Sequence, residues 1–174
     1  MKKFFLIPLL ACFTCVMAFA TVHEVANFDQ LKTAINGASD DDVIKLTDDI
    51  TGFANTSNYS ALNITKSITL DGQGHTLDGY GKRDATSNHA TLAINAKVNG
   101  VAPTHDVEVV IKNINIVNRY AGTASCARPL ETRGHLTSLT LDNVTISATN
   151  NYNEQGITIG GAQATAANIT MINR

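Results

Sequence analysis

The chain has 174 residues, of which 44% are hydrophobic, 16% charged and 6% aromatic, with no Trp and three Pro. This is enough for one domain with a hydrophobic core, and it excludes collagen, a disordered chain and a coiled coil. The formal net charge of -2 gives no sign of nucleic-acid binding. Charged residues are fewer than the roughly 25% of ordinary soluble domains, while Thr, Asn, Ile and Gly are abundant, so we expect a β protein with tight turns.

The first twenty residues have the pattern of a secretory signal peptide. This pattern is a basic start, an apolar stretch and small residues before a cleavage point, here Lys2 and Lys3, residues 4–17, and Ala18 and Ala20. We expect residues 1–20 to be removed after Ala20, so that a domain of residues 21–174 begins at Thr21. A competing interpretation uses residues 9–12 as a lipoprotein cleavage box and leaves a lipidated Cys12.

No later segment approaches the about 18 consecutive apolar residues of a membrane-spanning helix, so we expect no transmembrane segment in the mature part. The predicted location is therefore outside the cytoplasm: secreted, on the cell surface or in the periplasm.

The mature part opens with one short helix between two strands. A strand is expected at 21–25, and Asn27 stands three residues before Gln30 in a capping-box arrangement. Apolar residues then recur at helical spacing as far as Gly37. An acidic turn at 40–42 leads into a strand at 43–46, after which the helical period gives way to alternation.

The rest of the chain is a repeat. The segments 67–78, 108–118, 138–148 and 168–174 share two alternating apolar pairs around a turn residue. A shift of thirty residues relates the last three segments, with a looser spacing to the first. The turn positions form a predicted ladder of Gly72, Asn113, Asn143 and Asn173. Asn suits such turns because it tolerates the left-handed backbone conformation and its amides can hydrogen-bond from one copy to the next.

Another short strand precedes each repeat, at 61–64, 91–95, 128–133 and 156–160. A unit of three strands and about thirty residues cannot bury its own apolar row, but stacked copies about 4.8 Å apart can share one core. We therefore predict an all-β fold, a parallel β-helix (solenoid) of about four coils. The chain ends after the second strand of its fourth repeat, so we also expect it to be a C-terminally truncated piece of a longer protein.

The helix and acidic turn, followed by ITLDGQGHTLDG and the N-V-T-I type repeats, resemble the start of the pectin-lyase-like right-handed parallel β-helix superfamily. The resemblance implies a right-handed solenoid in which the helix caps the N-terminal end. It implies little about activity, because polysaccharide lyases, glycoside hydrolases, autotransporter passengers and surface adhesins share these turns.

The sequence offers little for catalysis, and we assign no catalytic residue. Pectate lyases of this fold use several calcium-binding carboxylates and an Arg; here Arg128, Pro129 and Arg133 match loosely and only Glu131 adds a carboxylate. The repeats also lack the paired Asp residues of glycoside hydrolases. The acidic turn, with Asp48 and Asp49, is better explained as a polar turn than as a calcium site, and the scattered His residues predict no metal site. We expect no cofactor, and calcium only if the lyase alternative holds.

The long connections after the third strand of each coil would stack on one side of the solenoid, where binding faces often form. Their aromatic and basic residues are the candidate ligand-binding set, namely Tyr80, Lys82, Arg83, Arg119, Tyr120 and Tyr152. Tyr can stack on sugars and Arg can pair with carboxylates. We predict a non-catalytic, adhesin-like surface protein whose lateral loops bind extracellular polysaccharide or a host surface. The alternatives are a polysaccharide lyase or glycoside hydrolase acting on acidic glycans, and a structural spacer.

Overall fold

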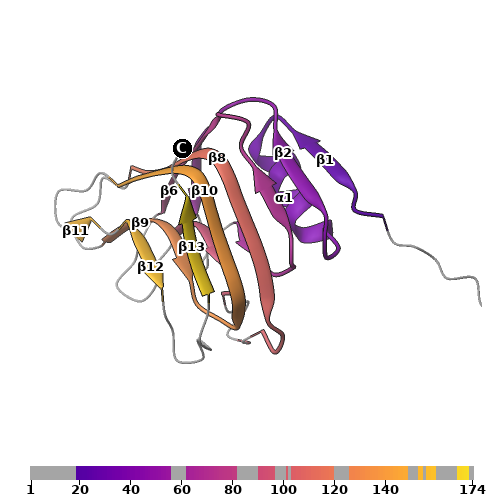
Figure 1. Cartoon of the computed structure of the whole chain (residues 1–174). Coiled ribbons are helices and arrows are strands. Elements are labelled where there is room, and N and C mark those ends of the chain that lie inside the picture. Colours follow the sequence, from indigo (N-terminus) through magenta and orange to yellow (C-terminus); the bar gives the residue numbers. More distant parts are fainter. Residues whose placement is uncertain are drawn as a thin grey trace, which may run out of the picture.

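The structure, a computed structural model, describes residues 19–55, 62–81, 90–96, 101, 103–119, 126–148, 153–154, 156–159 and 168–172. In these residues the fold is all-β with one short helix, α1 (Figure 1). The elements in chain order are β1 (Val22–Val25), α1 (Phe28–Gly37), β2 (Val43–Leu46), β3 (Ile50–Asn55), β4 (Asn63–Ile64), β5 (Thr69–Asp71), β6 (Thr76–Gly81), β7 (Ala90–Ile94), β8 (Val107–Asn118), β9 (Cys126–Thr132), β10 (Leu136–Ala148), β11 (Asn153–Glu154), β12 (Ile157–Ile159) and β13 (Asn168–Ile172).

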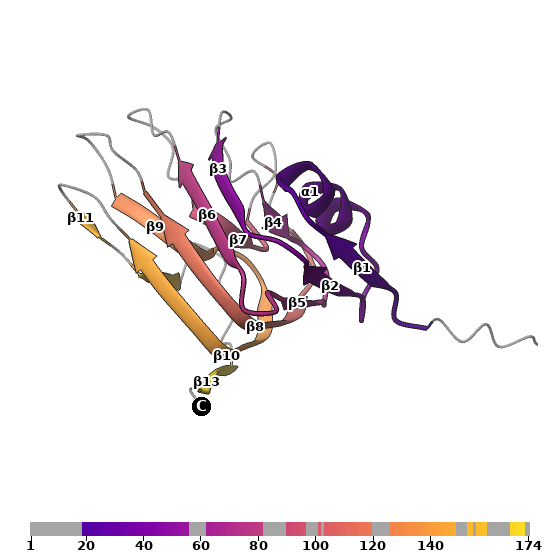
Figure 2. The ribbon, with the colours of Figure 1, turned by 90° about the horizontal axis from the view of Figure 1, so that it is seen from above.

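Among the described residues every strand pair is parallel, and the strands form two sheets. The first has the order β1-β2-β5-β8-β10-β13, with β3 and β6 continuing it beside the second half of β8. The second has the order β11-β9-β7-β4, with β12 also on β9. Parallel sheets built from strands that follow one another around a shared core fit a β-helix. Figure 2 shows the strands side by side, with α1 and β1 at one end of the row and β10 and β13 at the other.

The thirty-residue shift predicted from the sequence is the register of the last strands. Val110 pairs with Thr140, and Thr140 pairs with Thr170. The first repeat is further away, since Thr69 pairs with Val110 across 41 positions. The apolar positions of the repeat therefore lie directly above one another and form a continuous core.

That core consists of aliphatic side chains from both sheets. Ile44, Leu70, Ile111 and Leu141 are buried and are register partners in turn along the first sheet. Leu62, Ile64, Leu92, Ile94 and Leu130 supply the second sheet. At the far end Met171 is 64% exposed, although it is in register with buried Leu141.

Helix α1 covers the β1 end of this core. The side chain of Asn27 accepts a hydrogen bond from the main-chain nitrogen of Gln30 at 3.0 Å, as the capping box predicted, and the helix ends at Gly37. Its buried face contains Leu31, Ala34 and Ile35 and joins the core cluster. The helix contacts β1, β2, β3 and β4.

The turns between the two halves of the first sheet contain an amide ladder. Asn113 and Asn143 have positive φ angles of 51° and 55°, and the Asn143 amide donates to Asn113 Oδ1 at 3.1 Å. The Asn113 amide in turn donates to Asp71 Oδ1 at 3.2 Å. Each turn falls within one long strand, β8 or β10, rather than separating two short ones.

Gly72 is level with Asn113, but it is required for a different reason. The left-handed residues of its turn are Gln73 and Gly74. A Cβ on Gly72 would lie 2.6 Å from the carbonyl oxygen of Asn113 and would also clash with the Ile114 side chain. Glycine is therefore needed here for the close approach of the neighbouring coil. Asn173, the last predicted member of the ladder, lies outside the described residues.

Two of the described strands were not predicted, β3 and β11, and β11 lies in a segment that we expected to be a lateral loop. β3 pairs with β6 through the register pairs Ile50–Leu77 and Ala54–Tyr80. It is interrupted by Gly52, whose φ is +74°, and the register shifts between Thr51 and Phe53. β3 thus adds a strand on the N-terminal side of the first sequence repeat at 67–78.

Candidate functional site

The predicted binding loops start where the second half of the first sheet ends. Gly79 on β6 is the register partner of Asn118 on β8, and the main-chain nitrogen of Arg119 donates to Gly79 O at 3.2 Å. Tyr80 and Arg119 follow these partners and are therefore neighbours. The prediction that Tyr80 belongs to a loop is wrong, since it lies within β6 and pairs with Ala54, whereas Arg119 directly follows the end of β8. Tyr80 is described by its backbone alone, and Lys82, Arg83, Tyr120 and Tyr152 lie outside the described residues.

Arg119 is 66% exposed at its side chain, yet it is paired. Its Nε lies 2.9 Å from Oδ2 of Asp78, whose side chain is 10% exposed. Burial raises the pKa of Asp78, and the attraction of Arg119 only partly opposes this. Arg119 thus both projects into solvent and compensates a buried carboxylate at the root of the loop.

A second group of charges lies on β9. Glu131 is 1% exposed, and its Oε1 accepts from Arg128 Nη1 at 2.9 Å and from Arg133 Nε at 2.6 Å. Successive strand residues point to opposite faces, and Leu130 is in the core, so Glu131 lies on the outer face of the sheet. It stands in register between Ala93 and Thr158. Two guanidinium groups therefore converge on one buried carboxylate.

This arrangement bears on the lyase alternative. A lyase of the kind described above needs an arginine directed at the substrate and carboxylates that hold calcium. Here both arginines contact the single carboxylate of the strand. No group of three or more His, Cys, Asp or Glu that could hold a metal ion occurs among the described residues. The β9 cluster resembles a structural ion-pair group more than a catalytic centre.

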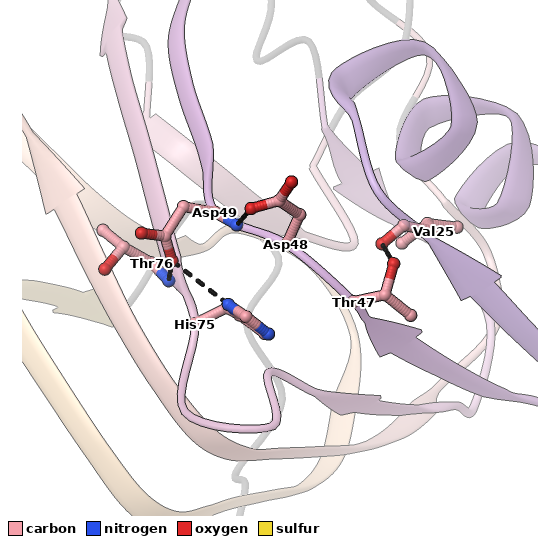
Figure 3. A network of polar contacts seen from close by, with 6 residues as sticks. All are labelled: Val25, Thr47, Asp48, Asp49, His75 and Thr76. Carbon is pink, nitrogen blue, oxygen red and sulfur yellow. Dashed lines mark hydrogen bonds and ion pairs between the residues drawn. The ribbon is translucent and has the colours of Figure 1, made fainter.

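The acidic residues near the N-terminal end act as hydrogen-bond acceptors between neighbouring segments. Asp40 Oδ1 accepts from the Ser67 nitrogen at 2.8 Å, and Asp49 Oδ1 accepts from the Thr76 nitrogen at 2.8 Å. Figure 3 shows His75 beside the same Asp49 carboxylate, with Nδ1 at 3.3 Å. The Thr76 N–H, together with His75, lowers the pKa of Asp49 against the opposing effect of burial. These carboxylates therefore join one coil to the next.

Two buried asparagines were not singled out by the sequence. Asn95 is fully buried, has a φ of 51°, and donates to the carbonyl oxygens of His105 and His135. Asn118, also fully buried, donates to Arg128 O at 3.2 Å. Asn95 ties the end of β7 to the segments before β8 and before β10, and Asn118 ties the end of β8 to β9. A polar residue at the end of an apolar strand is their only signal in the sequence.

A shallow groove of about 430 Å³ lies between α1 and β1. It is lined by His23, Glu24, Val25, Asp29, Gln30, Thr33 and Ala34. Its charged rim contains Glu24 and Asp29, so it is not suited to an acidic ligand. Arg119, the predicted binding residue whose side chain the structure describes, does not border it.

The architecture is that of a parallel all-β domain whose strands stack in register. The comparison with family models gives one match, to "Putative pectate lyase-like adhesive domain", over residues 22–174. The chain belongs to this family, and the resemblance to pectin-lyase-like proteins seen in the sequence is confirmed. No curated protein and no solved structure matches the chain. Within the described residues, no helix has the length and apolar character needed to cross a membrane.

Proposed function

We propose that this chain is an exported, non-catalytic adhesive domain, built as a right-handed parallel β-helix, whose lateral loops bind acidic polysaccharide. The observation that supports it most is the match of an adhesive-domain family to residues 22–174. Adhesion acts at a surface, so a secreted, cell-surface or periplasmic location follows from the same proposal. The signal-peptide pattern of residues 1–20 supports export.

The polysaccharide part of the proposal rests on the geometry of the loops. Stacked strands hold successive loops about 4.8 Å apart, so their side chains form rows that suit an extended polymer. Tyr80 lies in the last residues of β6, just before one such loop, and Arg119 directly follows the neighbouring strand β8. Exposed charge pairs contribute about 1 kcal/mol or less each and are screened by salt, so binding should be weak and sensitive to salt.

A lyase acting on acidic glycans is the second candidate, favoured by the arginines around Glu131 and by the lyase-like family description. The pairing of both arginines with Glu131 weighs against it. A structural spacer is the third candidate, because a stack of coils also separates whatever lies at its two ends.

The test is a glycan array combined with an activity assay on polygalacturonate with calcium. Arg83→Ala together with Arg119→Ala should abolish the salt-sensitive binding. Arg119→Ala leaves the buried Asp78 carboxylate without its arginine partner. A triple variant, Arg83→Ala, Arg119→Ala and Asp78→Asn, removes that unpaired charge as well. Lys32→Ala with Lys66→Ala is the control, since it removes two exposed charges outside the loops.

Binding that survives in the loop variant would remove these loops from the proposal. Release of unsaturated sugars would make the protein a lyase. Binding to no glycan at all, with the fold intact, would favour the spacer.

A further inference from the structure

Asp42 is a buried carboxylate beside the first residue of the predicted mature chain. It is 4% exposed, and its Oδ1 accepts a hydrogen bond from the Thr21 nitrogen at 2.8 Å. Its Oδ2 accepts from the Ser39 nitrogen at 2.9 Å and lies 3.1 Å from His23 Nε2. The Ser39 N–H, the Thr21 N–H and then His23 lower the pKa of Asp42 to about 2. The carboxylate is therefore ionised at neutral pH.

Thr21 is held in place by more than this one bond. Its carbonyl oxygen accepts from the Val43 nitrogen at 2.8 Å, and strand pairing continues from Val22 with Val43. The two residues before it are exposed, and Phe19 is 85% exposed. The ordered sheet thus begins at Thr21, with its nitrogen directed at a buried negative charge.

We propose that Asp42 is the receptor for the α-ammonium group of Thr21, which appears when the leader is removed after Ala20. A signal peptidase would hydrolyse the Ala20–Thr21 peptide bond with one water molecule. The new carboxylate of Ala20 leaves with residues 1–20, and the new amine of Thr21 takes up a proton at neutral pH. A neutral N–H donor thereby becomes a cation at the same position.

The consequence is that processing stabilises the fold. A hydrogen bond between an ammonium and a carboxylate is shorter and roughly twice as strong as one between neutral groups. Asp42 also connects the start of β1 to Ser39 and, through its carbonyl oxygen, to the Thr69 nitrogen on β5. Strengthening this contact therefore fixes the first strand, the acidic turn and the next coil together.

The pair gives the stability a defined pH dependence. An unperturbed α-amino group has a pKa of about 7.7–8.0, and a carboxylate partner raises that pKa in the folded chain. The stabilisation is then fully present below the unfolded value and is lost as the pH rises through the raised folded value. The other titratable groups around the pair are His23 on β1, Asp40 and Asp41 in the turn, and Lys66 in the loop that contacts the turn.

The experiment uses the full chain exported with its own leader. Mass spectrometry should show an N-terminus at Thr21. A variant with one Ala inserted between Ala20 and Thr21 keeps the Thr21 N–H as a neutral donor but moves the ammonium about 3.8 Å along the chain. At pH 6 we expect the unfolding equilibrium constant of this variant to be about tenfold larger, because its ammonium group no longer meets the Asp42 carboxylate at the position of the Thr21 nitrogen. The difference should vanish at a pH above the folded α-amino pKa.

Asp42→Asn, made in both backgrounds, is the matched control. The inserted residue should then have no effect, because no charge is left to receive the ammonium. Equal urea midpoints for the exported chain and the Ala-insertion variant at pH 6 would overturn the proposal. So would an exported chain that starts at Met1 or at a lipidated Cys12. The exported native chain and the Ala-insertion variant both keep Asp42. Comparing their stabilities tests the proposal even if Asp42→Asn does not fold, and the comparison needs no ligand.

Discussion

At the scale of single residues, several buried carboxylates are compensated by groups on a neighbouring segment, whereas Glu131 is compensated by arginines close to it in sequence. Oδ2 of Asp71 lies 3.3 Å from Nζ of Lys112 on β8, and Oδ2 of Asp78 lies 2.9 Å from Nε of Arg119. Asp42 is compensated by main-chain N–H groups and His23. Because an unpaired buried charge is strongly unfavourable, such pairs help to fix which strand lies beside which.

Asp42 predicts acid sensitivity. Its folded pKa of about 2 lies below the ordinary value of 3.8, so its contribution to stability is present above pH 3.8 and is lost as the pH falls towards 2. Urea unfolding midpoints measured between pH 6 and pH 2.5 should therefore fall, and fall less steeply in Asp42→Asn. The exposed Asp29→Asn serves as control. A variant whose acid profile matches that of the native chain would contradict this role.

Neutralising Glu131 should lower the free energy of unfolding by a large amount. Breaking a buried ion pair by removing one partner costs about 3–5 kcal/mol, and Arg133 is partly exposed, so we expect Glu131→Gln to lie near the lower figure, about 3 kcal/mol. The exposed Glu108→Gln should change the free energy of unfolding by no more than about 0.5 kcal/mol. Chemical denaturation measures both. Equal effects of the two substitutions would show that the β9 cluster is energetically unimportant.

At the scale of the elements, the turns of the first sheet combine two demands on one residue type. Asn143 must adopt a left-handed backbone and also donate its amide to Asn113. Asn meets both demands, whereas Gly meets only the first and Ala neither.

This predicts an order of stabilities. Asn143→Gly should lower the free energy of unfolding by about 0.5–1.5 kcal/mol, the contribution of one hydrogen bond. Part of this loss is offset because glycine adopts positive φ without strain. Asn143→Ala should lose about 1–2 kcal/mol more, because a Cβ without a local hydrogen bond disfavours this conformation. Thermal or urea unfolding of the two variants gives the order. An alanine variant as stable as the glycine variant would mean that the turn relaxes out of its left-handed conformation.

Element-scale features were predictable from the sequence where one physical rule decided them. The capping pair Asn27 and Gln30, the stop at Gly37 and the thirty-residue register were confirmed. β3 was missed because Gly52 breaks its alternation, and its pairing depends on β6, which comes later in the chain.

The candidate site was less predictable. The Arg119–Asp78 contact depends on β6 and β8 becoming neighbours, and the contacts of Arg128 and Arg133 with Glu131 depend on how the side chains are directed along one strand. Residue type and spacing alone do not determine these contacts. The turn ladder is a further example. Its first predicted member was Gly72, but the side chain that accepts the Asn113 amide is that of Asp71.

At the scale of the whole molecule, stability should be graded along the stack of parallel strands, because each strand pairs only with its neighbours in the sheet. β8 lies between β5 and β6 on one side and β10 on the other, and Val109, Ile111 and Ile116 on it are buried. Among the described strands β13 pairs only with β10, and Met171 on it is 64% exposed. Opening β13 therefore disrupts one interface, whereas opening β8 disrupts two.

Hydrogen exchange should reveal this gradient, since amides of central strands exchange only through larger openings. Peptides from β8 should exchange most slowly and those from β13 fastest, with β10 between them. Ile111→Ala, which removes a fully buried side chain at a typical loss of about 2–5 kcal/mol, should accelerate exchange in β5 and β10 as well as in β8. The exposed Thr145→Ala on β10 is the control and should leave the order unchanged. Protection of β13 equal to that of β8 would contradict graded stability, because an edge strand can be that well protected only when another segment or molecule covers it.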